Sequence, residues 1–111
     1  MGFLKSKSNG VEIITPDENI TFITSASYKQ ELAEIIENNF QLIMDMSELS
    51  FIDSSGVGLI IETSFKIRKK HGLFVICNVN EKIFKVFKLA NLVETINIAE
   101  DIETALALFV E

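Results

Sequence analysis

Short apolar runs alternate along this chain with longer segments of helical spacing, and this alternation limits the fold more than any other feature. The run at residues 73–77 (LFVIC) is apolar throughout, and the run at 40–45 (FQLIMD) has three consecutive apolar residues at its centre, which is typical of strands buried on both faces of a sheet. Between them, from Val57 onward, apolar residues recur at the spacing of one helix face. Strands that alternate with helices form parallel sheets, because parallel strands need a crossover connection.

The start of the chain predicts an antiparallel addition to this sheet. Asn9-Gly10 is a strong signal for a hairpin turn between strand-like segments at residues 3–8 and 11–15. Thr95–Ile98 predicts a short last strand. We therefore expect an α/β fold whose mixed sheet is antiparallel at the N-terminal hairpin, parallel in the remainder, and packed with about four α-helices. The apolar faces expected in these helices are Tyr28, Leu32, Ile35 and Ile36; Val57, Ile60, Ile61, Ser64 and Ile67; Ile83, Val86, Phe87 and Ala90; and Ile102, Ala105, Leu106 and Phe109.

Local signals mark where the helices begin and end. Residues 20–24 (ITFIT) alternate like a further strand and lead into a capping-box spacing that begins at Ser27. Asn80 and Asp101 are suited to cap the third and fourth helices. Gly72 predicts the stop of the second helix.

The charge of the chain excludes two classes of partner. Ten basic residues stand against sixteen acidic ones, a net charge of −6. Nucleic acids and anionic membranes attract basic surfaces, so neither is an expected partner. At 111 residues and 48% apolar composition, we expect one dense core and a single domain over residues 1–111, with a monomer as the expected state. Lys82, Lys85 and Lys88 form a stripe at helical spacing that we interpret as a solvated face.

The lack of a recognisable targeting signal and the single cysteine predict a cytoplasmic protein. The apolar runs are too short to span a bilayer, and no apolar leader follows Met1. The opening MGFLKS matches a myristoylation pattern, but no second membrane signal accompanies it. The single cysteine, Cys77, lies in an apolar run and is expected to be buried and reduced.

One stretch, FIDSSGVGLI at residues 51–60, places a carboxylate, two hydroxyls and two glycines in apolar surroundings. A serine nucleophile needs a base within hydrogen-bond reach, yet the only histidine, His71, lies about 24 Å away at the far end of the helix that begins here. The nucleophile-elbow pattern also fails, because Ile52 occupies the position of its first glycine. A serine hydrolase is therefore excluded.

Nucleotide and metal sites are disfavoured at this stretch as well. Ile61 stands where a dinucleotide-binding loop has its third glycine, and no Walker lysine follows. Asp53 would repel a bound phosphate. The histidine, the cysteine and the carboxylates show no metal-ligand spacing. We expect neither a cofactor nor a metal.

A capped helix start explains the hydroxyls but not the glycines. Asp and Ser are favoured N-caps, each worth about 1 kcal/mol relative to Ala. Gly56 and Gly58 each cost about 1 kcal/mol relative to Ala inside a helix. We interpret them as leaving the helix start bare, so that the backbone of another protein can approach Ser54 and Ser55.

Phosphorylation of an exposed serine at this helix start would act as a switch. A phosphate brings about −1.5 to −2 charges, and a helix N-terminus with unpaired amides tolerates an anion. The fold should survive the modification of Ser54. A partner docked there would meet new bulk and charge beside Asp53, so the interface would weaken.

The segment LSFIDSSGVGLI at 49–60 resembles the signature of STAS-domain anti-sigma-factor antagonists, and the similarity extends over nearly the whole chain. The resemblance implies a STAS fold without enzymatic activity that binds an anti-sigma factor with serine-kinase activity and so frees a sigma factor. Phosphorylation of Ser54, or alternatively Ser55, would abolish binding, and a serine phosphatase would restore it. The implied partner-binding residues are Asp53, Ser54, Ser55, Gly56, Val57 and the position of Thr21.

The chain departs from this family where a Gly-x-Leu-Asp element usually precedes the first helix. The matching residues here are ENIT, so Glu18 replaces the glycine and Thr21 the aspartate, with Asn19 and Ile20 between them. The missing carboxylate keeps open a second role, as a STAS scaffold in a signalling assembly without the phospho-switch. A phospho-aspartate receiver that uses Asp45, with acidic residues upstream, is the rival from another class.

Overall fold

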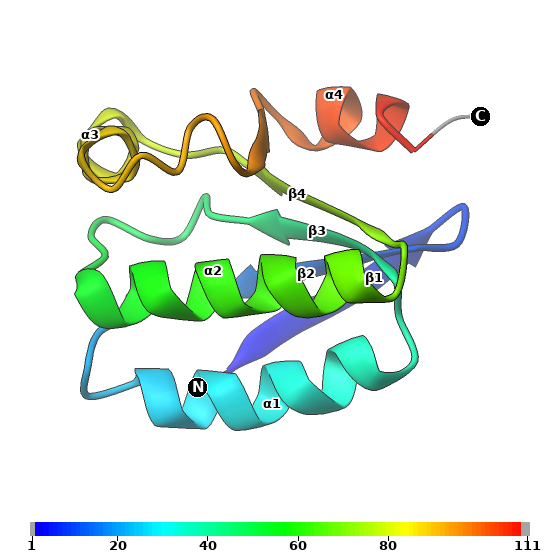
Figure 1. Ribbon diagram of the computed structural model, residues 1–111, viewed down its shortest axis with the longest axis horizontal. Coiled ribbons are helices and arrows are strands. Elements are labelled where there is room, and N and C mark those ends of the chain that lie inside the picture. The colour runs from blue at the N-terminus through cyan, green and yellow to red at the C-terminus, as the bar shows by residue number, and fades with distance from the viewer. Residues whose placement is uncertain (1, 110–111) are drawn as a thin grey trace.

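The computed structural model describes residues 2–109 and confirms the expected mixed α/β architecture (Figure 1). The five strands lie in the order β1-β2-β3-β4-β5; β1 and β2 pair antiparallel, and every later pair is parallel. Met1, with which the myristoylation pattern begins, and the last two residues of the expected 1–111 domain lie outside the described residues. The elements are β1 (Phe3–Ser8), β2 (Val11–Pro16), α1 (Ser25–Glu37), β3 (Gln41–Asp45), α2 (Ser54–Lys69), β4 (Leu73–Cys77), α3 (Glu81–Leu89), β5 (Asn97–Ala99) and α4 (Ile102–Ala107).

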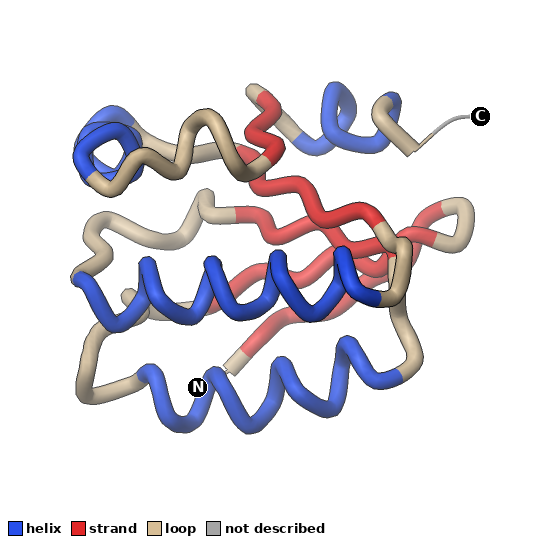
Figure 2. Tube along the Cα trace, viewed as in Figure 1, coloured by secondary structure: helices blue, strands red, loops and turns tan. Residues whose placement is uncertain are grey.

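The opening hairpin follows from its turn residues. Asn9 and Gly10 both have positive φ, 50° and 83°, as a tight turn with the twist of its flanking strands requires. Ser8 and Val11 face each other across this turn. The tube in Figure 2 shows the hairpin at one edge of the sheet, extending beyond the helices.

The two faces of the sheet bury different sets of helices, and the alternation of side chains along each strand sets the division. Leu42 and Met44 of β3 join the larger core with residues of α1, α2 and α3, whereas Ile43 faces the smaller core beneath α4. Phe74 and Val75 of β4 divide in the same way. Strands buried on both faces explain the consecutive apolar residues of the runs at 40–45 and 73–77.

The buried face of α1 is the predicted one: Tyr28, Leu32, Ile35 and Ile36. On α2 the prediction is wrong at Ile61, which is 47% exposed, while Leu59 is buried in its place. The predicted face of α3 fails at Ala90, which is exposed beyond the helix end. The last strand lies at 97–99 rather than 95–98.

Residues 20–24 are not a strand, and α1 does not begin at Ser27. Ile20 makes a single bridge to Ile52, after which the chain turns and α1 begins at Ser25. The Thr24 hydroxyl closes this turn: it donates to the Asn19 carbonyl at 2.7 Å and accepts from the Thr21 amide at 3.0 Å. These local bonds outweigh the period-2 alternation of the segment.

The end of α2 lies close to the predicted stop but has a different cause. His71, not Gly72, takes the left-handed conformation, with φ 61°. The Gly72 amide donates to the Ile67 carbonyl at 3.0 Å, a bond that closes the last turn. Gly72 is required for another reason, because a Cβ there would collide with the backbone carbonyl of Phe40.

Within residues 2–109, none of the helices has the length and apolarity needed to cross a membrane.

Candidate functional site

Asp53 organises the start of α2. Its Oδ1 accepts from the amides of Ser55 at 2.8 Å and Gly56 at 3.3 Å, so Asp53 is the N-cap. Ser54 is the first helical residue rather than the cap. The expectation of unpaired amides at this helix start is therefore wrong for Ser55 and Gly56, because a carboxylate already occupies them.

The same carboxylate ties a distant loop to the helix start. Asp53 Oδ2 accepts from the Phe22 amide at 3.1 Å, across 31 positions of sequence. Ile20, fully buried, bridges to Ile52 just before the cap. Two contacts therefore hold the 20–24 loop against the start of α2. We call residues 53–55, together with residues 21–23 of the loop, the tip.

Ser54 lies open to solvent at the tip, and Ser55 is partly buried. An added phosphate on Ser54 would stand beside the Asp53 carboxylate, whose Oδ1 already takes two of the amides that could have stabilised it. Two close anions repel. The phosphate would therefore be directed outward, away from the Asp53 carboxylate.

Gly56 and Val57, named from the sequence as contact residues, lie inside the fold. Val57 is 9% exposed. Gly56 is buried, and a Cβ there would collide with Ile52 and come within 2.7 Å of the Ile20 carbonyl. Gly56 thus admits the chain's own loop, and the interpretation that it leaves the helix bare for another protein is wrong. Gly58 is exposed with open space around it, so that interpretation survives only there.

Thr21 is partly buried, and its polar groups are used within the loop. Its amide donates to Thr24 Oγ1, and its own Oγ1 accepts from the Ile23 amide at 3.3 Å. The residue that replaces the usual aspartate thus stabilises the turn and brings no charge to the tip. The tip has one carboxylate, that of Asp53, where a Gly-x-Leu-Asp loop would add a second.

Sequence reasoning missed the exposed apolar residues in the 20–24 loop and just before the Asp53 cap. Phe22 and Ile23 are 75% and 78% exposed, and Phe51, two residues before the cap, is 41% exposed. The available signal was the segment's position. An apolar pair between the turn-forming residues 16–19 and a helix has no neighbouring strand to pack against. The alternation of the segment instead predicted a half-buried strand. Large exposed apolar side chains that gather around a polar centre are typical of protein-binding surfaces.

Tyr28 anchors the segment that leads into this loop. Its hydroxyl accepts from the Glu18 amide at 3.0 Å and lies 3.2 Å from the Asp17 carboxylate, to which it can donate. Burial raises the pKa of Tyr28 to about 12, so the hydroxyl keeps its proton. A hydrogen bond from the Gly2 amide lowers the pKa of Asp17. These bonds fix where the 20–24 loop begins.

Asp45, the residue of the rival receiver hypothesis, is buried and held by hydrogen bonds within the fold. It is 7% exposed and accepts from the Asn78 side chain at 2.8 Å and the Ser47 amide at 3.0 Å. In the described part of the chain, no three His, Cys, Asp or Glu side chains are grouped as a metal site would need. Burial, together with Asp45 and Asp101, raises the pKa of Cys77 to about 12, which keeps this buried thiol protonated.

Comparison with known proteins gives a consistent picture. The model of the STAS domain family matches residues 3–105. The anti-sigma-B factor antagonist of Bacillus subtilis is 22% identical, covering 86% of this chain and 87% of its own. The anti-sigma F factor antagonist of Paenibacillus polymyxa is 25% identical, covering 87% and 85%. A crystal structure of a putative anti-sigma factor antagonist from Thermotoga maritima superimposes with a TM-score of 0.91 at 22% identity, covering 96% of this chain and 92% of that one.

Proposed function

This chain belongs to the STAS domain family, and from that premise we propose that it is an anti-sigma factor antagonist switched by phosphorylation of Ser54. Unmodified, it binds an anti-sigma factor with serine-kinase activity through the tip of α2 and releases a sigma factor. Phosphorylation of Ser54 ends this binding, and a serine phosphatase reverses it. The proposed role is non-enzymatic, and family membership replaces the receiver hypothesis based on Asp45.

The observation that carries this proposal is the exposed Ser54 at the start of α2, directly after the Asp53 cap, whose carboxylate also accepts from the amide of the exposed Phe22. The Asp53 carboxylate accepts hydrogen bonds from both the Phe22 loop and the helix start and so joins them. An apolar rim around a polar centre suits a protein partner. A phosphate added at that centre would bring a second anion beside Asp53, at a tip whose own six residues include no cation to balance it.

The relatives named as antagonists of anti-sigma factors supply the class of partner. These two relatives are 22% and 25% identical to this chain in sequence. Which anti-sigma factor this chain binds therefore has to be established directly. The test is to recover the protein from its native cells together with the proteins bound to it, and to map phosphate by mass spectrometry. We expect an anti-sigma factor in the bound fraction, and phosphoserine at Ser54 in the unbound fraction. Phosphate at equal occupancy in both fractions would contradict the switch.

A scaffold role without the switch is the second candidate, and Thr21 favours it. The hydroxyl of Thr21 is used by the Ile23 amide and stands where the family's antagonists usually carry an aspartate. If that aspartate is needed for phosphoryl transfer, binding would persist while Ser54 stays unmodified. Incubation of the complex with ATP and Mg²⁺ separates the two roles: stable phosphate on serine supports the antagonist, and binding without phosphorylation supports the scaffold.

A further inference from the structure

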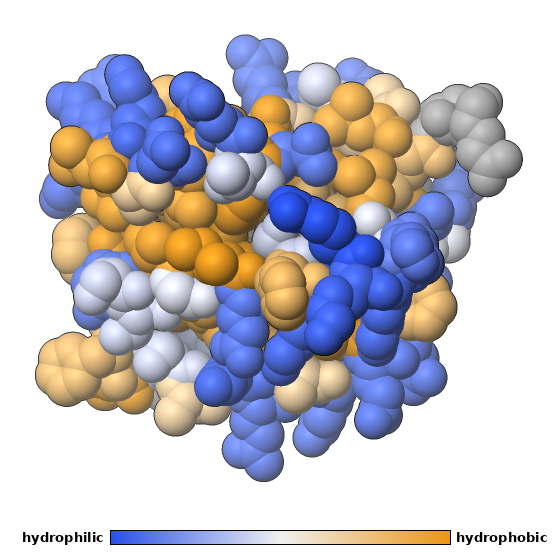
Figure 3. Space-filling model, in the orientation of Figure 1, coloured by the Kyte–Doolittle hydropathy of each residue, from blue (hydrophilic) through white to orange (hydrophobic). Residues whose placement is uncertain are grey.

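Two adjacent apolar side chains of the 20–24 loop lie at the surface almost without cover. Phe22 and Ile23 are 75% and 78% exposed, more than any other large apolar residue of the described chain except Leu89, at 90%. Figure 3 shows apolar surface projecting at the corner of the molecule where, in Figure 1, the loop before α1 approaches the start of α2. An isolated exposed apolar residue is ordinary, but two adjacent ones form a patch that the fold itself does not use.

Phe22 differs from the other exposed phenylalanines. The rings of Phe40, Phe51 and Phe65 each have a lysine ammonium over them, 5.2, 5.9 and 5.2 Å from the ring centroid, respectively. Within residues 2–109, no such cation and no second aromatic ring lies against Phe22. The chain thus covers three of its exposed rings in part and leaves the fourth bare.

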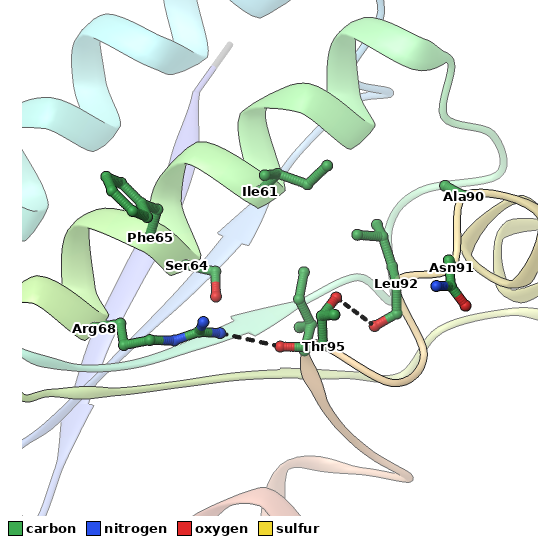
Figure 4. A pocket seen from close by; sticks show the side chains of 9 residues that line it. Ile61, Ser64, Phe65, Arg68, Ala90, Asn91, Leu92 and Thr95 are labelled. Carbon is green, nitrogen blue, oxygen red and sulfur yellow. Dashed lines mark hydrogen bonds between the residues drawn. The ribbon is translucent and has the colours of Figure 1, made fainter.

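The exposed apolar residues farther along α2 have neighbours from the chain itself. Ile61 and Phe65 are 47% and 59% exposed and line a hollow of about 340 Å³ that α2 shares with the segment 90–96. Figure 4 shows both residues on the same helix as Arg68, whose guanidinium reaches that segment and donates to the Thr95 carbonyl at 3.2 Å. The 20–24 loop therefore carries the least covered apolar pair.

Hydrogen bonds fix the backbone beneath these two side chains. The Phe22 amide donates to Asp53 Oδ2 at 3.1 Å, and the Ile23 amide donates to Thr21 Oγ1 at 3.3 Å. The Thr21 amide in turn donates to Thr24 Oγ1 at 3.0 Å. The loop is thus ordered before a partner arrives, so that binding costs little further backbone freedom.

The loop pair belongs to the same surface as Ser54. The Asp53 carboxylate accepts from the Phe22 amide through one oxygen, and through the other it caps the helix that Ser54 begins. A protein that covers Ser54 therefore lies against the loop as well. Residues 20–24 (ITFIT) carry no charge, so the loop offers that protein apolar surface and no ion pair.

We infer that Phe22 and Ile23 enter an apolar recess on the anti-sigma factor that docks at Ser54, and that this contact selects the partner; the inference rests on the proposed function. Large side chains that fill a pocket of the partner carry much of the binding energy of an interface. A charged surface opposite the loop is rejected, because its groups would lose water and find no charge in residues 20–24 to pair with. The state of Ser54 then decides whether docking occurs, and the loop decides with which anti-sigma factor.

The experiment measures the affinity of the recovered anti-sigma factor for loop variants, together with the thermal midpoint of each. We expect Phe22→Ser and Ile23→Ser each to weaken binding roughly tenfold at an unchanged midpoint, since neither side chain is packed in the fold. Phe22→Leu should lose less than Phe22→Ser, because it keeps an apolar side chain. Leu4→Ser on β1 and Leu89→Ser at the end of α3 are the matched controls, at exposed apolar residues outside the tip, and should bind like the parent.

A charge added to the loop tests the chemistry of the recess. Thr21→Asp and Thr21→Asn both keep a side-chain oxygen that can accept from the Ile23 amide, as Asp and Asn side chains do in turns. An apolar recess predicts that Thr21→Asp binds roughly tenfold more weakly than Thr21→Asn, because the carboxylate has to be desolvated there. Equal or tighter binding of Thr21→Asp would show that the surface opposite the loop is not apolar, and would overturn the inference.

The outcomes separate this inference from the proposed function. If Ser54→Asp blocks binding while Phe22→Ser and Ile23→Ser bind like the parent, the loop pair is not a contact and the inference fails alone. If light scattering shows a dimer for the parent and a monomer for Phe22→Ser, a second copy of the chain occupies the pair, and the inference is wrong. If no anti-sigma factor binds the parent protein, the proposed function fails, and the inference fails with it.

Discussion

The two ends of α2 are built by different means. At the N-terminal end, Asp53 fixes the helix start and the 20–24 loop through side-chain hydrogen bonds, and the surface beyond them stays open. At the C-terminal end, Gly72 lets the chain pass directly against the backbone of Phe40, and packing fixes the geometry. Hydrogen bonds to one carboxylate hold a surface in place without covering it. Close packing holds a surface in place only by burying it.

This difference fits the proposal that the switch lies at one end of α2 only. Ser54 is exposed, so a phosphate added there would have solvent on its outer side. A group of that size has no space at the other end, where the amide of Gly72 is bonded to Ile67 and its Cα faces a carbonyl. One end of α2 thus leaves room for the proposed switch, and the other end is packed against the start of the sheet strand that follows Phe40.

The largest effect on stability is expected at the packed end. Gly72→Ala places a methyl group against the Phe40 backbone, which cannot move without disturbing the start of β3, so we expect a loss of about 3 kcal/mol in the free energy of unfolding. Chemical denaturation measures it. Gly58→Ala is the matched control, because it makes the same change on an open surface. A loss below about 0.5 kcal/mol in Gly72→Ala would show that this end is not tightly packed.

A smaller effect is expected from the cap that holds the tip. Asp53→Ala removes the bonds to Ser55, Gly56 and Phe22, and a lost N-cap costs about 1 kcal/mol, up to about 2. Hydrogen exchange should accelerate at the amides of Phe22 and Ser55 before it does in the strands. Unchanged protection of the Phe22 amide would mean that Asp53 does not hold the loop.

A change of stability in the opposite direction is expected at Gly58. Ala at this exposed helical position should raise the free energy of unfolding by about 1 kcal/mol, since a glycine in a helix costs about that much. If Gly58 keeps the surface bare for the partner, the more stable variant should bind the anti-sigma factor less tightly. Higher stability with unchanged affinity would remove Gly58 from the interface.

The regular parts of this fold could be predicted from the sequence, because their signals are local. Asn9-Gly10 specifies the hairpin turn, and the apolar runs of β3 and β4 specify strands buried on both faces. The spacing of Tyr28, Leu32, Ile35 and Ile36 specifies the buried face of α1. In each case neighbouring residues along the chain carry the information that the structure uses.

The wrong predictions for the 20–24 loop and for the glycines concern residues whose conformation depends on contacts between distant segments. The 20–24 loop is held by Asp53 and Ile52, about 30 positions away, and the sequence pattern within the loop does not record them. Gly56 and Gly72 look like ordinary signals of flexibility or termination, yet each accommodates a backbone from elsewhere in the chain. The exposure of Phe22 and Ile23 follows from the loop and was missed with it.

The most direct test of the central claim compares Ser54→Asp and Ser54→Ala in affinity for the anti-sigma factor and in thermal midpoint. We predict that Ser54→Ala binds like the parent, that Ser54→Asp binds about 100-fold more weakly, and that both melt close to the parent. Ser6→Asp, on β1, supplies the control for an added carboxylate. Equal affinity of Ser54→Asp and the parent, or a binding loss explained by a large fall in the midpoint, would contradict the claim that the exposed tip of α2 is the switch.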